Sequence, residues 1–464
     1  MPSIKPTIFV IVLALIGVTA MAFVAKRDLS GSHASGRRLM LLDSQRLPLE
    51  EISRITLKRS GDPALVFERT GSGWVQVEPF AHPMDAFSIR QLAQQALQLE
   101  IIDQLSKDEL PESLSSSALA LDPPSTTVTY EWSGGMMTLN LGKSFLAGRA
   151  YLQIAGDDAI YVVNQSLHER AVTSDPKEWR ERAIFLDVGV ESDRIERNDG
   201  GSPLVLARDR KQWKMIEPVQ TRLDPAARDA LLQEFGRAHV GGFILDQPTD
   251  LSRFGLSDPI ASIAVMTTRL REGDGDAEDS ADAPKGQIEV QRLLIGSPVS
   301  VGSQDRFGLI EGRPGVVRVP ASVLASLFRK PENLVAATAS GVVPADVKTI
   351  VIRKGESELR LVRDLEKWRA PEHENVEVSA EAVNELLQQL TALQAPAVEF
   401  KPYPRELEVA TITFHGFDGK ALDTVRIAQE KDTGRWALEN GDNVLRVFPP
   451  GLKLSLTADD FGLK

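Results

Sequence analysis

The sequence predicts an α+β protein in which an N-terminal transmembrane helix precedes tandem repeats of an antiparallel sheet plus an amphipathic helix. Three observations lead to this prediction. An uncharged apolar segment stands near the N-terminus, one residue pattern recurs three times, and each copy surrounds a helix pattern with short alternating strands. Runs of strands with few helices favour α+β over a parallel βαβ sheet.

Composition limits the class of protein. The 464 residues correspond to roughly three domains. The net charge of −12 argues against a nucleic-acid partner, because such proteins carry a basic excess or patch. Cysteine is absent, which excludes disulfides, thiolate metal sites and a cysteine nucleophile.

The first element is expected at residues 7–24, which are apolar and carry no charge. As a helix this segment would be about 27 Å long, close to a hydrocarbon core of about 30 Å. We therefore expect contact with the membrane through 7–24, within an N-terminal region 1–28 followed by a linker 29–49. An uncleaved signal anchor is favoured, but Ala20-Met21-Ala22 would also suit cleavage of a signal peptide.

The orientation of this helix rests on weaker signals. Lys5 stands before it, whereas Lys26, Arg27 and further arginines follow, which opposes the positive-inside rule. Long domains translocate largely regardless of charge. We expect a single-pass membrane protein with an extracytoplasmic (periplasmic) body, with a cleaved, secreted form as the alternative.

The body contains a pattern that occurs three times. The reference position of each copy is a tryptophan, at Trp74, Trp213 and Trp368, and these stand 139 and 155 residues apart. These spacings exceed those of solenoid repeats, so whole domains are expected at 50–186, 187–342 and 343–464. Around each tryptophan the matching positions are Arg69, Arg208 and Arg363 five residues earlier, Asp85, Asp224 and Ser379 eleven later, and Leu92, Leu231 and Leu386 eighteen later.

Each repeat is expected to begin with a small meander of strands followed by a helix. In the first copy, 54–59 and 65–69 alternate like half-buried strands, and 74–77 continues the meander. Asp85, Asp224 and Ser379 are good N-cap residues, because their side chains can accept from free amides of the first turn. Further strands should follow the helix, in the first copy at 126–130, 138–141, 151–154 and 160–163.

These motifs resemble a bacterial family, domain of unknown function 4340. The resemblance rests on a Trp-x-x-x-x-Pro segment, a capped helix and an L-x-[IL]-G strand, which occurs at 139–142 and 293–296. The third copy departs, because Pro371 comes early and the L-x-[IL]-G strand is missing. The resemblance implies one membrane helix and an envelope role near gliding-motility-type ABC transporter components. It supplies no catalytic residues.

The repeated side chains have structural and functional interpretations. The tryptophans could be ligand platforms, but their place between strand and helix favours core anchors. The arginines could bind an anion, but we expect them to pair with Glu78, Glu217 and Glu372, or to be exposed.

Other motifs favour no particular chemistry. Residues 142–144 (GKS) lack the glycine that a phosphate-binding loop needs at position 137. The acidic run 272–284 is expected to be a disordered insertion in the second repeat, because Asp279 and Lys285 replace key residues of a calcium loop. The six histidines show no local metal-ligand spacing.

We therefore expect no catalytic, cofactor-binding or metal residues, and no cofactor. The leading hypothesis is a structural or accessory scaffold with protein partners in an envelope complex such as an ABC transporter. The alternative is a ligand- or glycan-binding module, which predicts exposed aromatic residues such as Trp132, Trp179 or Trp436 beside a concave pocket. An enzyme is the third hypothesis, and predicts a cleft with clustered titratable groups.

Overall fold

The computed structural model describes residues 40–463 apart from 43–46, 72, 107–114, 146, 187, 189–191, 202, 210–211, 270–286, 366 and 374–375. The predicted membrane helix 7–24 and the acidic insertion 272–284 lie outside the described residues. The chain divides into two compact units, Met1–Glu181 and Arg182–Lys464.

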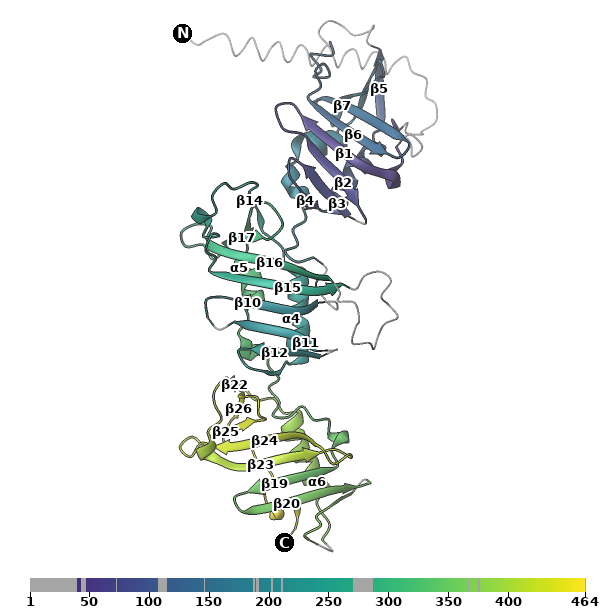
Figure 1. The fold of residues 1–464 in the computed structure, drawn as a ribbon. Helices are drawn as coiled ribbons and strands as arrows, with labels where there is room; N and C mark the ends of the chain where they lie inside the picture. Colours follow the sequence, from purple (N-terminus) through teal and green to yellow (C-terminus); the bar gives the residue numbers. More distant parts are fainter. Residues whose placement is uncertain are drawn as a thin grey trace. The chain divides into compact units, whose positions relative to one another are not determined.

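The first unit is built on one nine-stranded antiparallel sheet (Figure 1), whose strand order is β4-β3-β2-β1-β6-β7-β8-β9-β5. One long helix, α2 (Ala86–Leu97), follows β4 in the chain. The strands are β1 (Ile52–Arg59), β2 (Leu65–Thr70), β3 (Gly73–Glu78), β4 (His82–Met84), β5 (Ile101–Ser106), β6 (Thr126–Trp132), β7 (Gly135–Phe145), β8 (Arg149–Ile154) and β9 (Ala159–Asn164).

The second unit contains two sheets of similar order. The second repeat has nine strands ordered β13-β12-β11-β10-β15-β16-β17-β18-β14, with helices α4 (Pro225–Arg237) and α5 (Ala321–Leu327). Its strands are β10 (Ser192–Asn198), β11 (Leu204–Asp209), β12 (Gln212–Glu217), β13 (Thr221–Arg222), β14 (Gly242–Leu245), β15 (Ala261–Arg269), β16 (Gln287–Pro298), β17 (Arg306–Ile310) and β18 (Val316–Val319).

The third repeat has eight strands ordered β21-β20-β19-β23-β24-β25-β26-β22, with helix α6 (Ala380–Thr391). Its strands are β19 (Thr349–Lys354), β20 (Ser357–Asp364), β21 (Lys367–Arg369), β22 (Ala397–Glu399), β23 (Glu408–His415), β24 (Ala421–Gln429), β25 (Trp436–Glu439) and β26 (Leu445–Phe448). In all three sheets the strand that follows the long helix returns to the far edge.

The predicted fold class is wrong. Three large antiparallel sheets dominate the structure, so the protein is mainly β rather than α+β. The predicted helices are present, but they contribute little to the structure, because each sheet has one long helix of only 12 or 13 residues. The transmembrane part of the prediction is also unsupported: no helix among the described residues is long and apolar enough to cross a membrane.

The core of each repeat lies between one sheet face and the long helix. Leu92, Leu231 and Leu386 are at most 2 % exposed in their three clusters. Strand side chains alternate between faces, so one row of each strand joins this core while the other row forms an outer face. This outer face is free to differ between repeats.

The long helices begin at the residues that the repeat pattern marks. Asp85 accepts a hydrogen bond from Ser88 N at 2.8 Å, and Asp224 accepts one from Ala227 N at 2.7 Å. Ser379 caps α6 through Ala382 N at 3.2 Å. Each cap satisfies an amide that has no partner within the helix.

The glycine of the L-x-[IL]-G strand allows a close backbone contact. A Cβ on Gly142 would lie 2.6 Å from Leu119 O, and one on Gly296 would lie 2.1 Å from Phe254 O. In the third repeat the register places Ala428 here, since Thr126, Ala261 and Ala410 pair with the residue before each of these positions. The motif therefore serves packing in the first two repeats.

Candidate functional site

The repeated tryptophans lie between sheet and helix. Trp74 is 8 % exposed and Trp368 is 5 % exposed, each within the core cluster of its repeat. Trp213 is partly buried against the second cluster. These positions leave little aromatic face for a ligand.

Arg69 does not lie beside Glu78, but it is exposed, which was the other expectation for these arginines. Arg69 stands opposite Trp74 in the register, whereas Glu78 lies four residues further along the strand, about 13 Å away. Arg69 donates instead to Glu50 O at 2.6 Å, in the short helix before β1. Arg363 similarly donates to Pro344 O at 2.9 Å.

The second repeat uses its arginine differently. Arg208 Nη2 donates to Asp193 Oδ1 at 2.6 Å, and Thr268 N donates to Asp193 Oδ2 at 2.7 Å. Burial alone would raise the pKa of Asp193, but the hydrogen bonds from Thr268 and Arg208 outweigh it and lower that pKa. The repeated arginines thus fix the start of the first strand of each sheet.

The aromatic residues that a glycan-binding module would need are not exposed platforms. Trp179 is completely buried in the first core. Trp132 and Trp436 are partly buried and pack against the first and third clusters.

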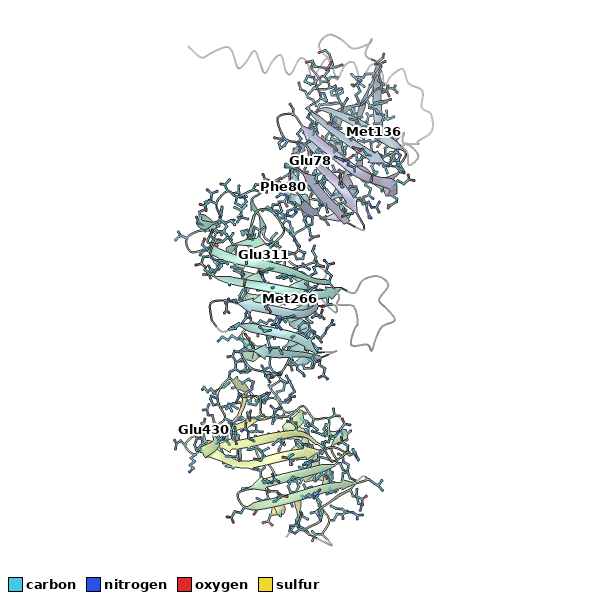
Figure 2. All side chains as sticks on the ribbon, viewed as in Figure 1. Glu78, Phe80, Met136, Met266, Glu311 and Glu430 are labelled. Carbon is cyan, nitrogen blue, oxygen red and sulfur yellow. The ribbon has the colours of Figure 1, made fainter. Side chains whose placement is uncertain are left out.

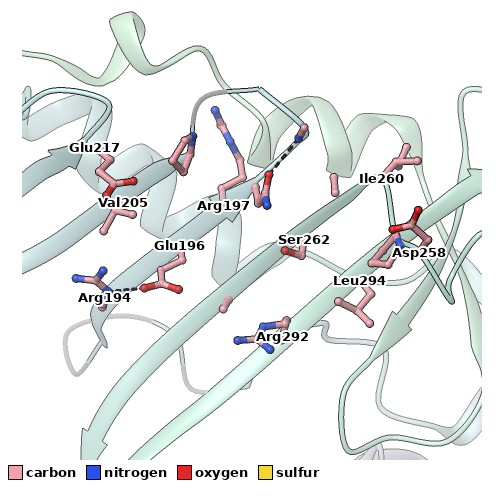
Figure 3. Close-up of a pocket in the computed structure, with 16 residues that line it drawn as sticks. Arg194, Glu196, Arg197, Val205, Glu217, Asp258, Ile260, Ser262, Arg292 and Leu294 are labelled. Carbon is pink, nitrogen blue, oxygen red and sulfur yellow. Dashed lines mark hydrogen bonds and ion pairs between the residues drawn. The ribbon is translucent and has the colours of Figure 1, made fainter.

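The outer face of the second sheet carries a pocket of about 660 Å³ (Figure 3). We call it the β15 hollow, because Ser262 and Ala264 of β15 form the middle of its lining. Their neighbours Ile263 and Val265 point into the helix-side core, so alternation places Ser262 and Ala264 on the opposite face.

Strand register explains why this part of the face is hollow. Ala264 pairs with Glu196 on β10 and with Arg292 on β16. Two long charged side chains therefore flank a methyl group. In the next row, Ser262 lies between Asn198 and Leu294. Small residues at the centre of both rows leave the space unfilled.

The other two repeats carry threonine pairs at the equivalent position. Ile55, Ile195 and Ile350 each pair with the residue seven before the repeat tryptophan, which aligns the three sheets. On this alignment Ala264 corresponds to Thr129 and Thr413, and Arg292 corresponds to Thr138 and Thr424. The threonines are hydrogen-bonded across the strands, Thr129 to Thr138 at 2.9 Å and Thr413 to Thr424 at 3.2 Å.

The rim of the β15 hollow carries both charges. Arg194 Nε donates to Glu196 Oε1 at 2.6 Å, and both side chains remain more than one-third exposed. Arg292 Nη1 is 3.4 Å from Glu311 Oε2, and Glu311 follows β17 in the second repeat (Figure 2). Glu217 and Asp258 add carboxylates near the two ends of the lining (Figure 3).

Arg197 borders the hollow from the helix side of the sheet. Its side chain is 5 % exposed, donates to Arg329 O at 2.6 Å and stacks on Phe328 with Cζ 5.4 Å from the ring centre. Burial lowers the pKa of Arg197, although Asp199 and Glu332 act in the opposite direction. We assign this residue to packing at the end of β10, an inner strand of the sheet.

The chemistry of the hollow is that of a binding surface. Apolar atoms come from Val205, Ile260 and Leu294, and the rim supplies guanidinium and carboxylate groups. The described residues that line it include no histidine and no aromatic residue. Among the described residues, no group of three or more His, Asp or Glu side chains could hold a metal ion.

Sequence reasoning did not find this hollow. The repeat pattern is defined by residues near the tryptophans. The hollow depends instead on which residues of β10, β15 and β16 pair with one another in the middle of the sheet. The available signal was the change from threonine at 129 and 413 to alanine at 264. This difference between the repeats can be recognised only after the strand pairing of the three sheets has been used to align them.

Fold and site together define a mainly-β protein with tandem antiparallel sheets, one of which has a charge-rimmed hollow. The chain belongs to the family described as domain of unknown function (DUF4340), whose model matches residues 74–244 and 213–411. The two overlapping matches begin at Trp74 and Trp213, which confirms the family resemblance. No curated protein and no solved structure matches the chain.

Proposed function

We propose that this protein is a non-enzymatic docking protein of the bacterial envelope, and that the β15 hollow binds a polypeptide segment of a partner. One observation carries the proposal. The second repeat has Ala264 and Arg292 where the other two repeats carry hydrogen-bonded threonine pairs, and its hollow lies over these two positions.

The lining suits a polypeptide better than a small polar ligand. An apolar side chain of the partner would fill the space over Ala264, against Val205 and Leu294. The partly exposed Arg194, Glu196 and Arg292 would meet flanking charges of both signs. Buried apolar contact supplies affinity in such interfaces, and the charged rim supplies specificity.

The family resemblance supports an envelope partner, and we propose a subunit of an envelope complex such as an ABC transporter. We also propose that the three sheets lie outside the cytoplasm. Protease treatment of intact and permeabilised cells tests the location. Digestion that requires permeabilisation of the inner membrane would contradict it.

A graft between repeats tests the docking surface. The double variant Ala264→Thr/Arg292→Thr gives the second sheet the threonine pair that its neighbours already contain, so it should fold. In-cell crosslinking followed by affinity capture and mass spectrometry should lose the partner with this variant. The control Thr413→Ala/Thr424→Ala changes the equivalent row of the third sheet and should retain it.

The same experiment can overturn the proposal. If the partner captured by the unmodified chain is also captured equally by the graft variant, the hollow is not the docking surface. Loss with the control and the graft alike would point to a general effect on the sheets.

A further inference from the structure

A second pocket, of about 380 Å³, lies inside the Arg182–Lys464 unit. Its lining includes Lys214, Thr221 and Arg222 from the edge of the second sheet, and Asp442 and Asn443 from the loop between β25 and β26. We call it the junction pocket. It shares no lining residue with the β15 hollow, so a ligand in the junction pocket would be independent of the proposed function.

Asp442 is the one carboxylate among the described residues of this lining, and it is already neutralised. Arg446 Nη2 lies 2.8 Å from Asp442 Oδ2, and Arg446 Nη1 lies 3.1 Å from Asp442 Oδ1. Arg446 is fully buried. Thr221 Oγ1 also donates to Asp442 Oδ2, at 2.5 Å. Asp442 therefore has little capacity left to balance further positive charge.

The remaining charged side chains of the lining are positive. Lys214 and Arg222 are register partners on β12 and β13, so they lie side by side. The contact of Lys214 with Asp209 is long, at 3.4 Å, and that carboxylate is 69 % exposed. A solvated ion pair of this kind contributes little and releases the lysine easily.

Arg222 is only partly satisfied. Its Nη2 donates to Thr338 O at 3.1 Å, while its Nε is buried and has no hydrogen-bond partner in the described part of the chain. Burial and then the charge of Arg446 lower the pKa of Arg222, against the effects of Asp423 and Asp442. A half-buried cation close to a second cation would be stabilised by an added anion.

We propose that the junction pocket binds a small oxyanion of the phosphate type, held by Lys214 and Arg222. Such an ion would add charge-assisted hydrogen bonds to two adjacent cations, in a protein whose overall charge is −12. The ion would contact residues of the second sheet and of the loop between β25 and β26 in the third repeat.

Isothermal titration of the full-length chain with inorganic phosphate, at constant ionic strength set by chloride, tests this site. We expect saturable binding that Lys214→Gln weakens roughly tenfold, since a charge-assisted hydrogen bond is lost. The matched control is Lys420→Gln, in the third repeat and 83 % exposed. It should leave the affinity unchanged.

A parallel titration with glycerol phosphate distinguishes the source of the anion. Tighter binding of inorganic phosphate would assign the site to the free ion, and tighter binding of glycerol phosphate would assign it to a phosphoester headgroup. The proposal fails if neither ligand gives saturable binding, or if Lys214→Gln and Lys420→Gln change the affinity equally.

Discussion

Thr221 Oγ1 donates a 2.5 Å hydrogen bond to Asp442 Oδ2 and thereby joins the edge of the second sheet to a loop of the third. The connecting segment is held between the same elements, because Ala336 N donates to Arg222 O and Ala336 O accepts from Arg446 Nε. Val444 completes the contact by packing into the second core. Side chains from both repeats therefore fix this connection.

We first predict that Thr221→Val destabilises the second unit by about 1 kcal/mol. The substitution keeps the shape but removes a donor from a partly buried carboxylate. Denaturant unfolding measures the change. Thr411→Val is the control, because its hydroxyl makes only a 3.5 Å contact at an exposed site. Equal effects of the two variants would contradict the importance of the Thr221 contact.

Loss of the ion pair between Arg446 and Asp442 should reduce stability more than loss of the Thr221 hydrogen bond. Arg446→Met leaves the Asp442 carboxylate without its buried partner, at an expected cost of about 3–5 kcal/mol. The double variant Arg446→Met/Asp442→Leu should lose less stability than Arg446→Met alone, since no charge is then stranded. Unfolding curves of both variants decide this. A double variant that is less stable than Arg446→Met would contradict the explanation that the stranded Asp442 carboxylate causes the loss.

The two strand glycines give a steric prediction. Gly142→Ala and Gly296→Ala would each place a Cβ within 2.6 Å of a backbone oxygen. Each should cost about 1–3 kcal/mol, the range for forced overpacking. Gly73→Ala is the matched control, because its nearest neighbour would be 3.7 Å away. Thermal unfolding that shifts equally for all three variants would refute the packing explanation.

The first unit should lose stability as the pH falls. Burial lowers the pKa of His168 to about 4, although the hydrogen bond to Tyr151 O acts in the opposite direction. The unfolded chain binds a proton near pH 6.5 and the folded chain does so only near pH 4. Stability is therefore complete above pH 6.5 and is lost between pH 6.5 and 4, by up to about 3 kcal/mol.

His168→Gln should flatten this pH dependence while keeping a donor for Tyr151 O. Urea unfolding at several pH values between 4 and 7 measures the slope. His239→Gln is the control, since His239 is exposed and belongs to the second unit. An unchanged slope in the His168 variant would show that this histidine does not cause the acid sensitivity.

Local features were predictable from sequence where a single turn or strand determines them. The N-cap residues Asp85, Asp224 and Ser379 needed only a short-range signal, since a cap bonds to its own helix. The fold class was wrong because each sheet has eight or nine strands against one long helix of 12 or 13 residues, so strands dominate the structure.

Features that depend on pairing between distant strands were missed. The expected contact of Arg69 with Glu78 failed because the register places Arg69 opposite Trp74. The β15 hollow could not be predicted from the sequence for a similar reason. It requires Ala264 to lie between Glu196 and Arg292, which come from strands on either side in the sheet.

The central claim is that the β15 hollow, and not the equivalent face of another repeat, contacts a partner. A photo-crosslinking amino acid at Ser262 tests this directly, with Thr127 and Thr411 as controls at the same position of the other sheets. We predict a discrete crosslinked partner in cells from position 262 and none from 127 or 411. The same adduct from all three positions, or an adduct from the controls only, would contradict the account.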